Sequence, residues 1–162
     1  MLAKERLRRR YRPKRVRILF VGEAPPASGR FFYQADSGLY RAIRDTFLRA
    51  LPGMDAEDFL SAFQASGCYL VDLCGRPVDH LAAKVRKLAW VEGEARLARI
   101  LRKLRPDMVI VVVRSIVDNV HQAQDRAGWH GKLIELPYPG RWHHYRIIFQ
   151  KRLVAILRKT LR

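Results

Sequence analysis

Two short proline-containing loops carry the side chains that this sequence best arranges for binding a ligand. Residues 22–26 read Gly-Glu-Ala-Pro-Pro, and residues 136–142, near the other end of the chain, read Leu-Pro-Tyr-Pro-Gly-Arg-Trp. Gly22 allows close approach to the backbone, and the paired prolines stiffen the exit so that Glu23 points in a fixed direction. A loop of this kind is suited to gripping a ligand. Because both loops follow strand-like runs, we expect them to share one site.

The segments around these loops alternate between strand-like and helix-like patterns. Strands are predicted over residues 16–21, 68–73, 108–113 and 132–136, and helices over 38–51, 55–67, 80–104, 115–126 and from about 146 onward. The unbroken apolar run at 108–113 is typical of a strand that is covered on both faces. We therefore predict a single α/β domain over residues 16–162, with three layers (α/β/α) and a mostly parallel sheet of about four strands. Domains of this class bind ligands at the carboxyl ends of their strands.

The charge of the chain is strongly positive. Its 162 residues include 32 Lys and Arg against 15 Asp and Glu, which gives a formal net charge of +17. Such an excess attracts polyanions through counterion release and favours DNA as the partner over small-molecule metabolism. The alternative is a solvated basic surface, or a basic structural module associated with ribosomes. Residues 1–15 are predicted to be a basic arm that contacts nucleic acid, or else a disordered solubilising tail.

Cysteine content and hydropathy indicate the compartment. Cys68 and Cys74 are the only cysteines, and two thiols cannot hold a structural zinc ion or an iron-sulfur cluster. A catalytic cysteine is not expected here. No apolar run approaches the roughly 20 residues of a membrane span, and no secretory signal is recognised. We expect a reduced, monomeric, cytoplasmic protein without a membrane partner.

Four segments of the chain resemble the uracil-DNA glycosylase superfamily, and most of all its branch whose first motif reads Gly-Glu-Ala-Pro-Gly. Residues 22–26 match that motif, and residues 29–32, Gly-Arg-Phe-Phe, stand where the branch has Gly-Arg-Pro-Phe. Residues 69–73 stand where the family has a strand that ends in a base-reading asparagine, and residues 136–139 where it has His-Pro-Ser-Pro. The resemblance implies a fold like that of the uracil-DNA glycosylases. It implies that Glu23 orients water or the sugar, that the base contacts Gly22, Ala24, Pro25, Phe32 and Asp72, and that DNA contacts Arg30, Pro139, Arg141, Trp142 and His143.

Departures from the family pattern bear on the chemistry. Hydrolysis of an N-glycosidic bond needs an extruded nucleotide, a stabilised departing base and a carboxylate that steadies the cationic sugar or orients water. Ala24 and Leu136 stand where many members have an aspartate and a histidine for these tasks. The branch also has four cysteines for an iron-sulfur cluster, and this chain has two. No cofactor is therefore expected.

Asp72 stands where the family has its asparagine, which changes the recognition chemistry. An ionised aspartate only accepts hydrogen bonds, so it would face the O4 carbonyl of uracil repulsively. A base edge with two donors, or a protonated Asp72, would fit the site better. Alternatively, Asp72 only caps a neighbouring helix or pairs with Arg76. We expect that uracil is not the best substrate.

Several other residues have two interpretations each. Adjacent His143 and His144 point apart on an extended loop, so we expect no metal site. One of these two histidines contacts phosphate or replaces the missing motif histidine, or else neither has a role. Trp142, with Arg141, either enters a DNA groove or belongs to the core. Asp36 is assigned mainly to capping the helix that begins near residue 38.

These observations support two functional hypotheses. The first is a DNA glycosylase that excises a damaged or deaminated base. The alternative is a non-enzymatic nucleic-acid-binding member of the same fold, which Ala24 and Leu136 favour. Convergence of Glu23, Phe32, Asp72 and residues 136–142 around one pocket would separate both hypotheses from that of a basic structural module.

Overall fold

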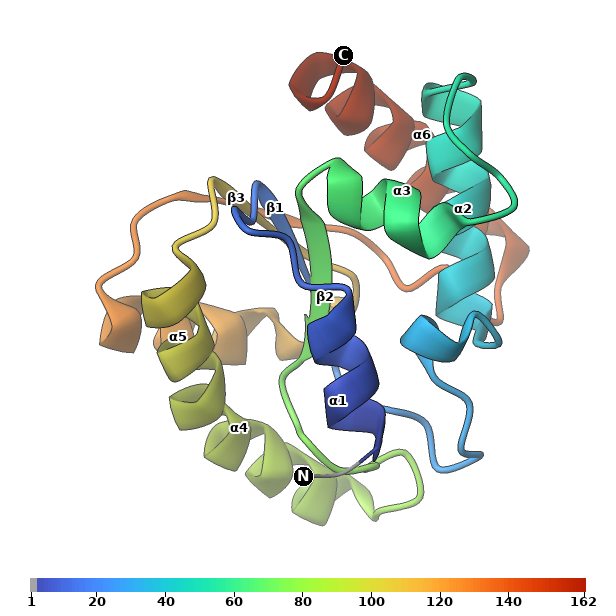
Figure 1. Cartoon of the computed structure of the whole chain (residues 1–162). Coiled ribbons are helices and arrows are strands. Elements are labelled where there is room, and N and C mark those ends of the chain that lie inside the picture. Colours follow the sequence, from blue (N-terminus) through green and yellow to red (C-terminus); the bar gives the residue numbers. More distant parts are fainter. Residues whose placement is uncertain (1–2) are drawn as a thin grey trace.

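The structure, a computed structural model, describes residues 3–162, and its centre is a four-stranded parallel sheet (Figure 1). The strands are β1 (Ile18–Gly22), β2 (Cys68–Asp72), β3 (Met108–Val111) and β4 (Lys132–Glu135), in the spatial order β2-β1-β3-β4. All three strand pairings are parallel, so the sheet is parallel throughout. The carboxyl ends of the strands therefore meet at one edge, from which both proline-containing loops leave.

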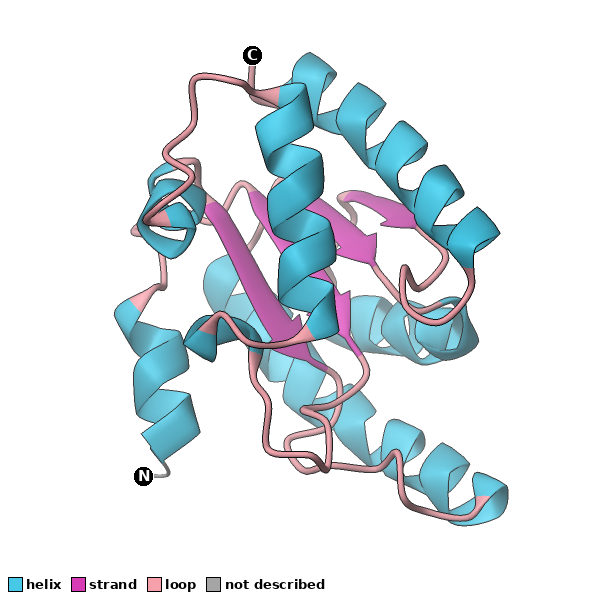
Figure 2. Cartoon of the chain, turned by 90° about the vertical axis from the view of Figure 1, so that its right-hand side faces the viewer, coloured by secondary structure: helices cyan, strands magenta, loops and turns pink. Residues whose placement is uncertain are grey.

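Helices cover both faces of the sheet (Figures 1 and 2). One layer contains α2 (Gly38–Ala50), α3 (Phe59–Ala65) and α6 (His143–Thr160), and the other contains α4 (Ala83–Leu104) and α5 (Val117–Ala127). Helix α1 (Ala3–Arg10) packs on a short 3-10 turn, η1 (Phe32–Gln34), and a second turn, η2 (Arg114–Ile116), leads into α5. This arrangement confirms the three-layer α/β/α prediction. No helix within residues 3–162 has both the length and the apolar character needed to cross a membrane.

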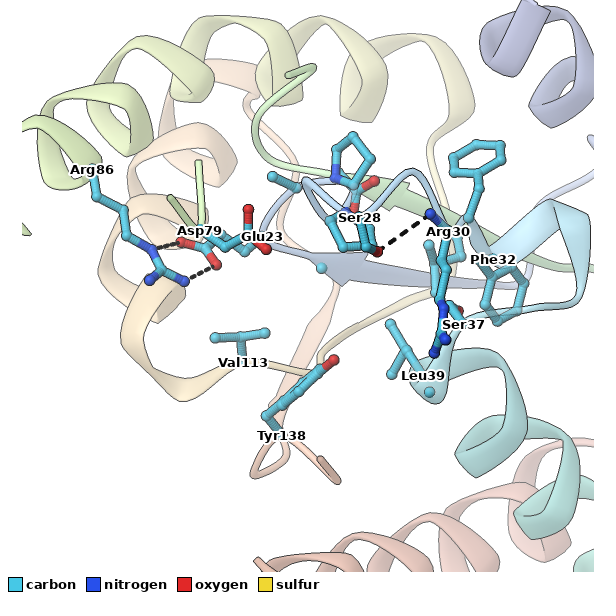
Figure 3. A pocket seen from close by; sticks show the side chains of 18 residues that line it. Glu23, Ser28, Arg30, Phe32, Ser37, Leu39, Asp79, Arg86, Val113 and Tyr138 are labelled. Atoms are coloured by element: carbon cyan, nitrogen blue, oxygen red, sulfur yellow. Dashed lines mark hydrogen bonds and ion pairs between the residues drawn. The ribbon is translucent and has the colours of Figure 1, made fainter. Parts of the chain in front are cut away.

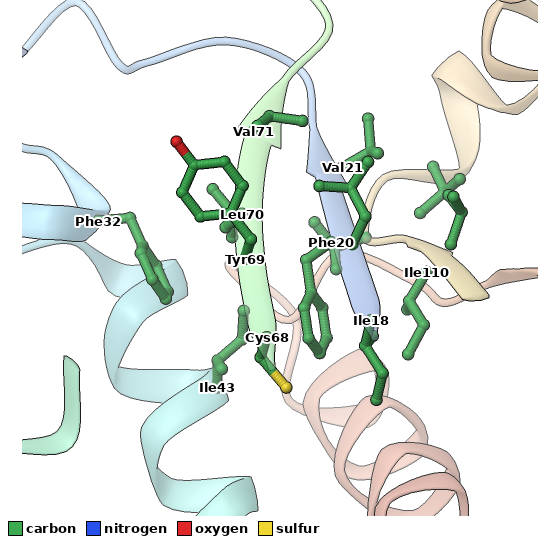
Figure 4. Packing of buried hydrophobic residues seen from close by; sticks show 14 of the residues in the cluster. Ile18, Phe20, Val21, Phe32, Ile43, Cys68, Tyr69, Leu70, Val71 and Ile110 are labelled. Carbon is green, nitrogen blue, oxygen red and sulfur yellow. The ribbon is translucent and has the colours of Figure 1, made fainter. Parts of the chain in front are cut away.

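The core lies between the sheet and the helices on each face. All five residues of β1 are buried, as expected for a strand at the centre of a parallel sheet. Phe20, Phe47 and Phe63 form an aromatic cluster with ring centroids 5.3–6.1 Å apart (Figure 4 shows Phe20 among the buried residues of the sheet). On the other face, Gly93 lets α4 approach β2, because a Cβ atom there would lie 2.5 Å from the Leu73 carbonyl oxygen. Helix α4 is thereby fixed beside the carboxyl end of β2.

Some predicted helix starts were wrong by a few residues. Helix α4 begins at Ala83 rather than at residue 80, and α3 begins at Phe59 rather than at 55, because Asp58 accepts a hydrogen bond from the Ser61 amide and caps it. Helix α6 begins at His143 rather than near 146. His143 and His144 are therefore helical, and the prediction that they lie on an extended loop was wrong.

Helix α2 begins at Gly38 as predicted, but its capping residue differs from the prediction. Ser37, rather than Asp36, caps the helix, with its hydroxyl oxygen accepting from the Tyr40 amide at 3.1 Å. Asp36 instead accepts from the Phe31 amide at 2.7 Å. Asp36 therefore fixes the end of the first loop, and Ser37 caps the helix that follows.

Candidate active site

A pocket of about 460 Å³ opens at the carboxyl edge of the sheet. Its walls come from the ends of β1 and β2, from the loop after β1, from the start of α2 and from Val113 after β3. Figure 3 shows Glu23 and Arg86 at one end, Arg30 and Phe32 at the other, and Tyr138 facing them from the last loop. Three carboxylates, Glu23, Asp72 and Asp79, line this pocket although the chain is strongly basic. Two guanidinium groups, those of Arg30 and Arg86, belong to the same lining.

Glu23 is held by two residues of α4. The Arg86 guanidinium donates to both carboxylate oxygens, with Nε 2.6 Å from Oε2 and Nη2 2.5 Å from Oε1 (Figure 3). The Trp90 indole nitrogen donates to Oε2 at 2.7 Å. The hydrogen bond with Glu23 raises the pKa of Arg86, and the Glu23 side chain is only 13% exposed. The carboxylate is therefore paired with a guanidinium group, partly desolvated and fixed in orientation.

Sequence reasoning missed Arg86 and Trp90. The two positions are four residues apart on a helix, so they share one face, and this spacing was the available signal. It shows that the two side chains lie together, but it does not identify Glu23 as their partner.

The backbone of the first loop is fixed by the segment that follows β2. The Leu73 amide donates to the Gly22 carbonyl at 2.9 Å, and the Cys74 amide donates to the Glu23 carbonyl at 2.8 Å. Further along, the Ala27 amide donates to both carboxylate oxygens of Asp79, at 3.1 and 3.3 Å. The loop is thus anchored to a neighbouring strand end as well as stiffened by its prolines.

Asp72 ends β2 and lies beside Gly22, its register partner on β1. Only 6% of the residue is exposed, and its Oδ2 accepts from Nη2 of Arg8 at 3.2 Å. The Arg96 guanidinium donates to the main-chain oxygen of Asp72. Burial raises the pKa of Asp72, while Arg8 and Arg96 act against the rise. The ion-pair partner of Asp72 is thus Arg8, not Arg76.

Arg8 lies in the segment for which a basic arm was predicted. In the structure it belongs to α1, is only 5% exposed and also pairs with Glu5 at 2.5 Å. Its guanidinium carbon lies 5.2 Å from the centroid of the Phe31 ring, a cation-π contact. This part of the segment therefore packs beside the pocket. The domain boundary at residue 15 stays a prediction, as does the DNA contact.

Phe32 lines the pocket and belongs to the core at the same time. It is 4% exposed and packs against Tyr33, Tyr40 and Phe63, with centroid separations of 5.0, 5.6 and 5.5 Å. Its neighbour Phe31 is 2% exposed and also lines the pocket. The aromatic wall is thus rigid, and a base that stacked on it would meet a surface already formed.

Of residues 136–142, only Tyr138 lines the pocket. Leu136 is fully buried, and its amide donates to the Val111 carbonyl at 2.8 Å. Tyr138 is 47% exposed and Trp142 is 57% exposed, so the interpretation of Trp142 as a core residue was wrong. The guanidinium of Arg141 lies 5.5 Å from the Trp142 ring centroid, outside the pocket. Pro139, Trp142 and His143 likewise lie outside it, whereas Gly22, Ala24, Pro25 and Arg30 line it.

The cysteines take no part in this site. Cys68 begins β2 and Cys74 follows its end, and burial raises their pKa values to about 12 and about 11. Their separation along an extended strand is roughly 20 Å. They therefore do not fit the ligand set of a shared cluster, and within residues 3–162 no group of three or more His, Cys, Asp or Glu side chains is placed to hold a metal ion.

A family model described as the uracil DNA glycosylase superfamily matches residues 9–158, nearly the whole chain. The chain belongs to the uracil DNA glycosylase superfamily. The match includes both proline-containing loops and the ends of β1 and β2 that build the pocket. A comparison with curated proteins gave no match. Membership supports a DNA glycosylase-like function in general, with DNA as the class of substrate.

Proposed function

We propose that the protein is a DNA glycosylase that hydrolyses the N-glycosidic bond of an extruded nucleotide. The observation that carries the proposal is the Glu23 carboxylate, fixed by Arg86 and Trp90 in a pocket walled by Phe32 and Tyr138. A pocket with rigid aromatic walls suits a base that has left the stack. The net charge of +17 supports binding of the DNA backbone.

Glu23 would act as a fixed anion beside the sugar. Its carboxylate offers about four acceptor positions, and Arg86 and Trp90 fill three of them, one on Oε1 and two on Oε2. The position left on Oε1 can orient a water molecule, and the negative charge stabilises the cationic sugar as the C1′–N bond breaks. The electron pair of that bond leaves with the base, while the water oxygen bonds to C1′ and the proton it loses neutralises the base anion.

The departing base needs a hydrogen-bond donor, and Leu136 cannot provide one. Among the residues of the last loop, the Tyr138 hydroxyl is the donor that lies at the pocket. Burial raises the pKa of Tyr138, and the charges of Asp72 and Glu23 raise it further. The hydroxyl therefore stays protonated at neutral pH and can donate to the negative charge that develops on the base.

DNA would run past the last loop. Trp142 and Arg141 are exposed, they follow closely in the chain after Tyr138, which lines the pocket, and α6 begins directly after them. An exposed aromatic side chain beside a base pocket can enter the stack and hold the duplex open. Arg141 and His143 would contact phosphates on either side of such a wedge. Affinity should fall steeply with salt, because phosphate contacts release counterions.

The test is base release from a panel of single- and double-stranded oligonucleotides, each with one modified or deaminated base, scored as abasic sites. We expect release from at least one member, weaker release of uracil, and a loss of roughly 100-fold or more in Glu23→Gln. Glu57→Gln, an exposed site before α3, is the matched control and should retain full activity. Salt-dependent binding without release from any member would favour the non-enzymatic alternative.

A further inference from the structure

The Asp72 carboxylate faces the pocket through a gap that only glycine leaves open. Asp72 lines the pocket, and its Oδ1 lies 2.8 Å from the point where a Cβ atom on Gly22 would stand. Any other residue at position 22 would therefore collide with this oxygen. Among the described residues, no side chain or amide donates to Oδ1, whereas Oδ2 accepts from Arg8. Oδ2 is thus held by Arg8, and Oδ1 is available to a ligand.

Arg8 favours the ionised form of this carboxylate. The side chains of Arg8 and Asp72 are only 6% and 8% exposed, and a guanidinium does not lose its proton in proteins. Its Nη1 donates to Glu5, its Nη2 donates to Asp72, and its Nε is buried without a partner among residues 3–162. Protonation of Asp72 would leave this buried cation with Glu5 alone as its counter-charge, which is costly away from water. Although burial raises the pKa of Asp72, the buried guanidinium of Arg8 acts against that rise, so Asp72 faces the ligand as an acceptor.

We infer that the pocket recognises bases whose edge carries an amino group beside a ring N–H, the edge of guanine and its lesions. The available oxygen, Oδ1, has two acceptor positions, which adjacent N–H donors can fill, and guanine offers N1–H next to the N2 amino group. Uracil instead places its single N–H between two carbonyl oxygens, which the carboxylate repels. Adenine and cytosine offer an amino group beside a ring acceptor, so only one of the two contacts is favourable.

This inference rests on the proposed function for the identity of the ligand, an extruded base. It can nevertheless be tested by binding alone. Hypoxanthine is the informative probe, because it differs from guanine only by the absence of the 2-amino group. A lost hydrogen bond to a charged acceptor should weaken binding roughly tenfold or more.

The experiment measures the affinity of the full chain for duplexes that carry one bulged nucleotide: guanine, hypoxanthine or uracil. Guanine should bind at least tenfold more tightly than either of the others. Equal affinities for guanine and hypoxanthine in the wild-type protein would overturn the inference, and this comparison needs no variant. Base release is scored on the same oligonucleotides. Discrimination with no release from any member of the wider panel of modified bases would contradict the proposed function and leave the inference standing, whereas release with no discrimination would do the reverse.

Variants identify the residue responsible. Asp72→Asn should lose the guanine preference and bind hypoxanthine and uracil at least as well as guanine, because an amide also donates. Asp45→Asn, exposed on α2, is the matched control and should keep the preference. Because Asp72→Asn leaves Arg8 with Glu5 as its remaining counter-charge, the double variant Arg8→Met with Asp72→Asn removes the buried cation as well, and both variants are checked by thermal melting. A folded double variant that still prefers guanine would contradict the role of Asp72.

Discussion

The loop after β1 and the loop after β4 both contain closely spaced prolines and both leave the carboxyl edge of the sheet, yet they contribute very differently to the pocket. Most of the first loop lines it, from Gly22 through Pro26 and again at Ser28 and Arg30. The last loop contributes Tyr138 alone, while Leu136 is fully buried and Trp142 is more than half exposed.

The difference lies in what each loop is tied to. The first loop is bonded to the segment after β2 and, through Glu23, to Arg86 and Trp90 of α4. The last loop instead buries its leucine and two prolines and exposes Trp142 at the start of α6. The first loop thus holds the Glu23 carboxylate in a fixed position, whereas the last loop leaves Trp142 exposed to a binding partner. Under the proposed function, catalysis would belong to the first loop and DNA contact mainly to the last.

The two regions should differ most in how far a substitution lowers the free energy of unfolding. Phe32→Ala removes a buried ring that packs on Tyr33, Tyr40 and Phe63, and should lower the free energy of unfolding by about 3–5 kcal/mol. Tyr138→Ala, at a half-exposed site, should cost less than about 1 kcal/mol. Urea denaturation measures both. Similar losses at the two sites would mean that the loops do not differ in rigidity.

A second contrast concerns the group that holds Glu23. Arg86→Gln removes the two-point contact and leaves Trp90, so Glu23 should become mobile and base release at saturating enzyme should slow by roughly 10- to 100-fold. Lys87→Gln, exposed on the same helix, is the control and should release the base at the wild-type rate. An unchanged rate in Arg86→Gln would show that the orientation of Glu23 does not matter.

Tyr138 is the exception within the last loop, and its hydroxyl can be tested without disturbing its ring. Tyr138→Phe should slow base release about tenfold, the cost of one hydrogen bond to a developing charge, while the affinity for DNA stays the same. The loss should be larger for bases that are poorer leaving groups. A weakened affinity with no change in the rate would instead assign Tyr138 to DNA binding.

Substitution of Trp142 should give the smallest effect, and it should change the affinity for DNA rather than the rate of base release. Trp142→Ala should weaken duplex binding about fivefold, near 1 kcal/mol, and leave the rate at saturation unaltered. Leu88→Ala, an exposed apolar site on α4, serves as the control for loss of surface hydrophobicity. Fluorescence anisotropy and single-turnover kinetics on one duplex separate affinity from rate.

The sequence predicted the fold well because its signals are local. Four apolar runs mark the strands, and residues 38–50 and 83–104 carry a helical pattern, so the order and type of these elements could be predicted. The capping residue was harder to predict where two neighbouring polar side chains could each cap a helix, as Asp36 and Ser37 could at the start of α2.

The site was predicted only in part, because its key contacts join distant parts of the chain. Glu23 meets Arg86 and Trp90 across 63 and 67 residues, and Asp72 meets Arg8 across 64. No local pattern specifies such partners. The resemblance led to Glu23, Phe32 and Asp72, which do line one pocket. It could not indicate that Leu136 is fully buried in the core.

The most direct test of this division of labour is a crystal structure of Glu23→Gln bound to a duplex with one lesion that the wild-type protein releases. We expect the nucleotide to be extruded into the pocket between Phe32 and Tyr138, with Trp142 at the gap in the stack and phosphates along residues 139–143. A duplex bound elsewhere on the basic surface, with the lesion still stacked and the pocket empty, would contradict the account.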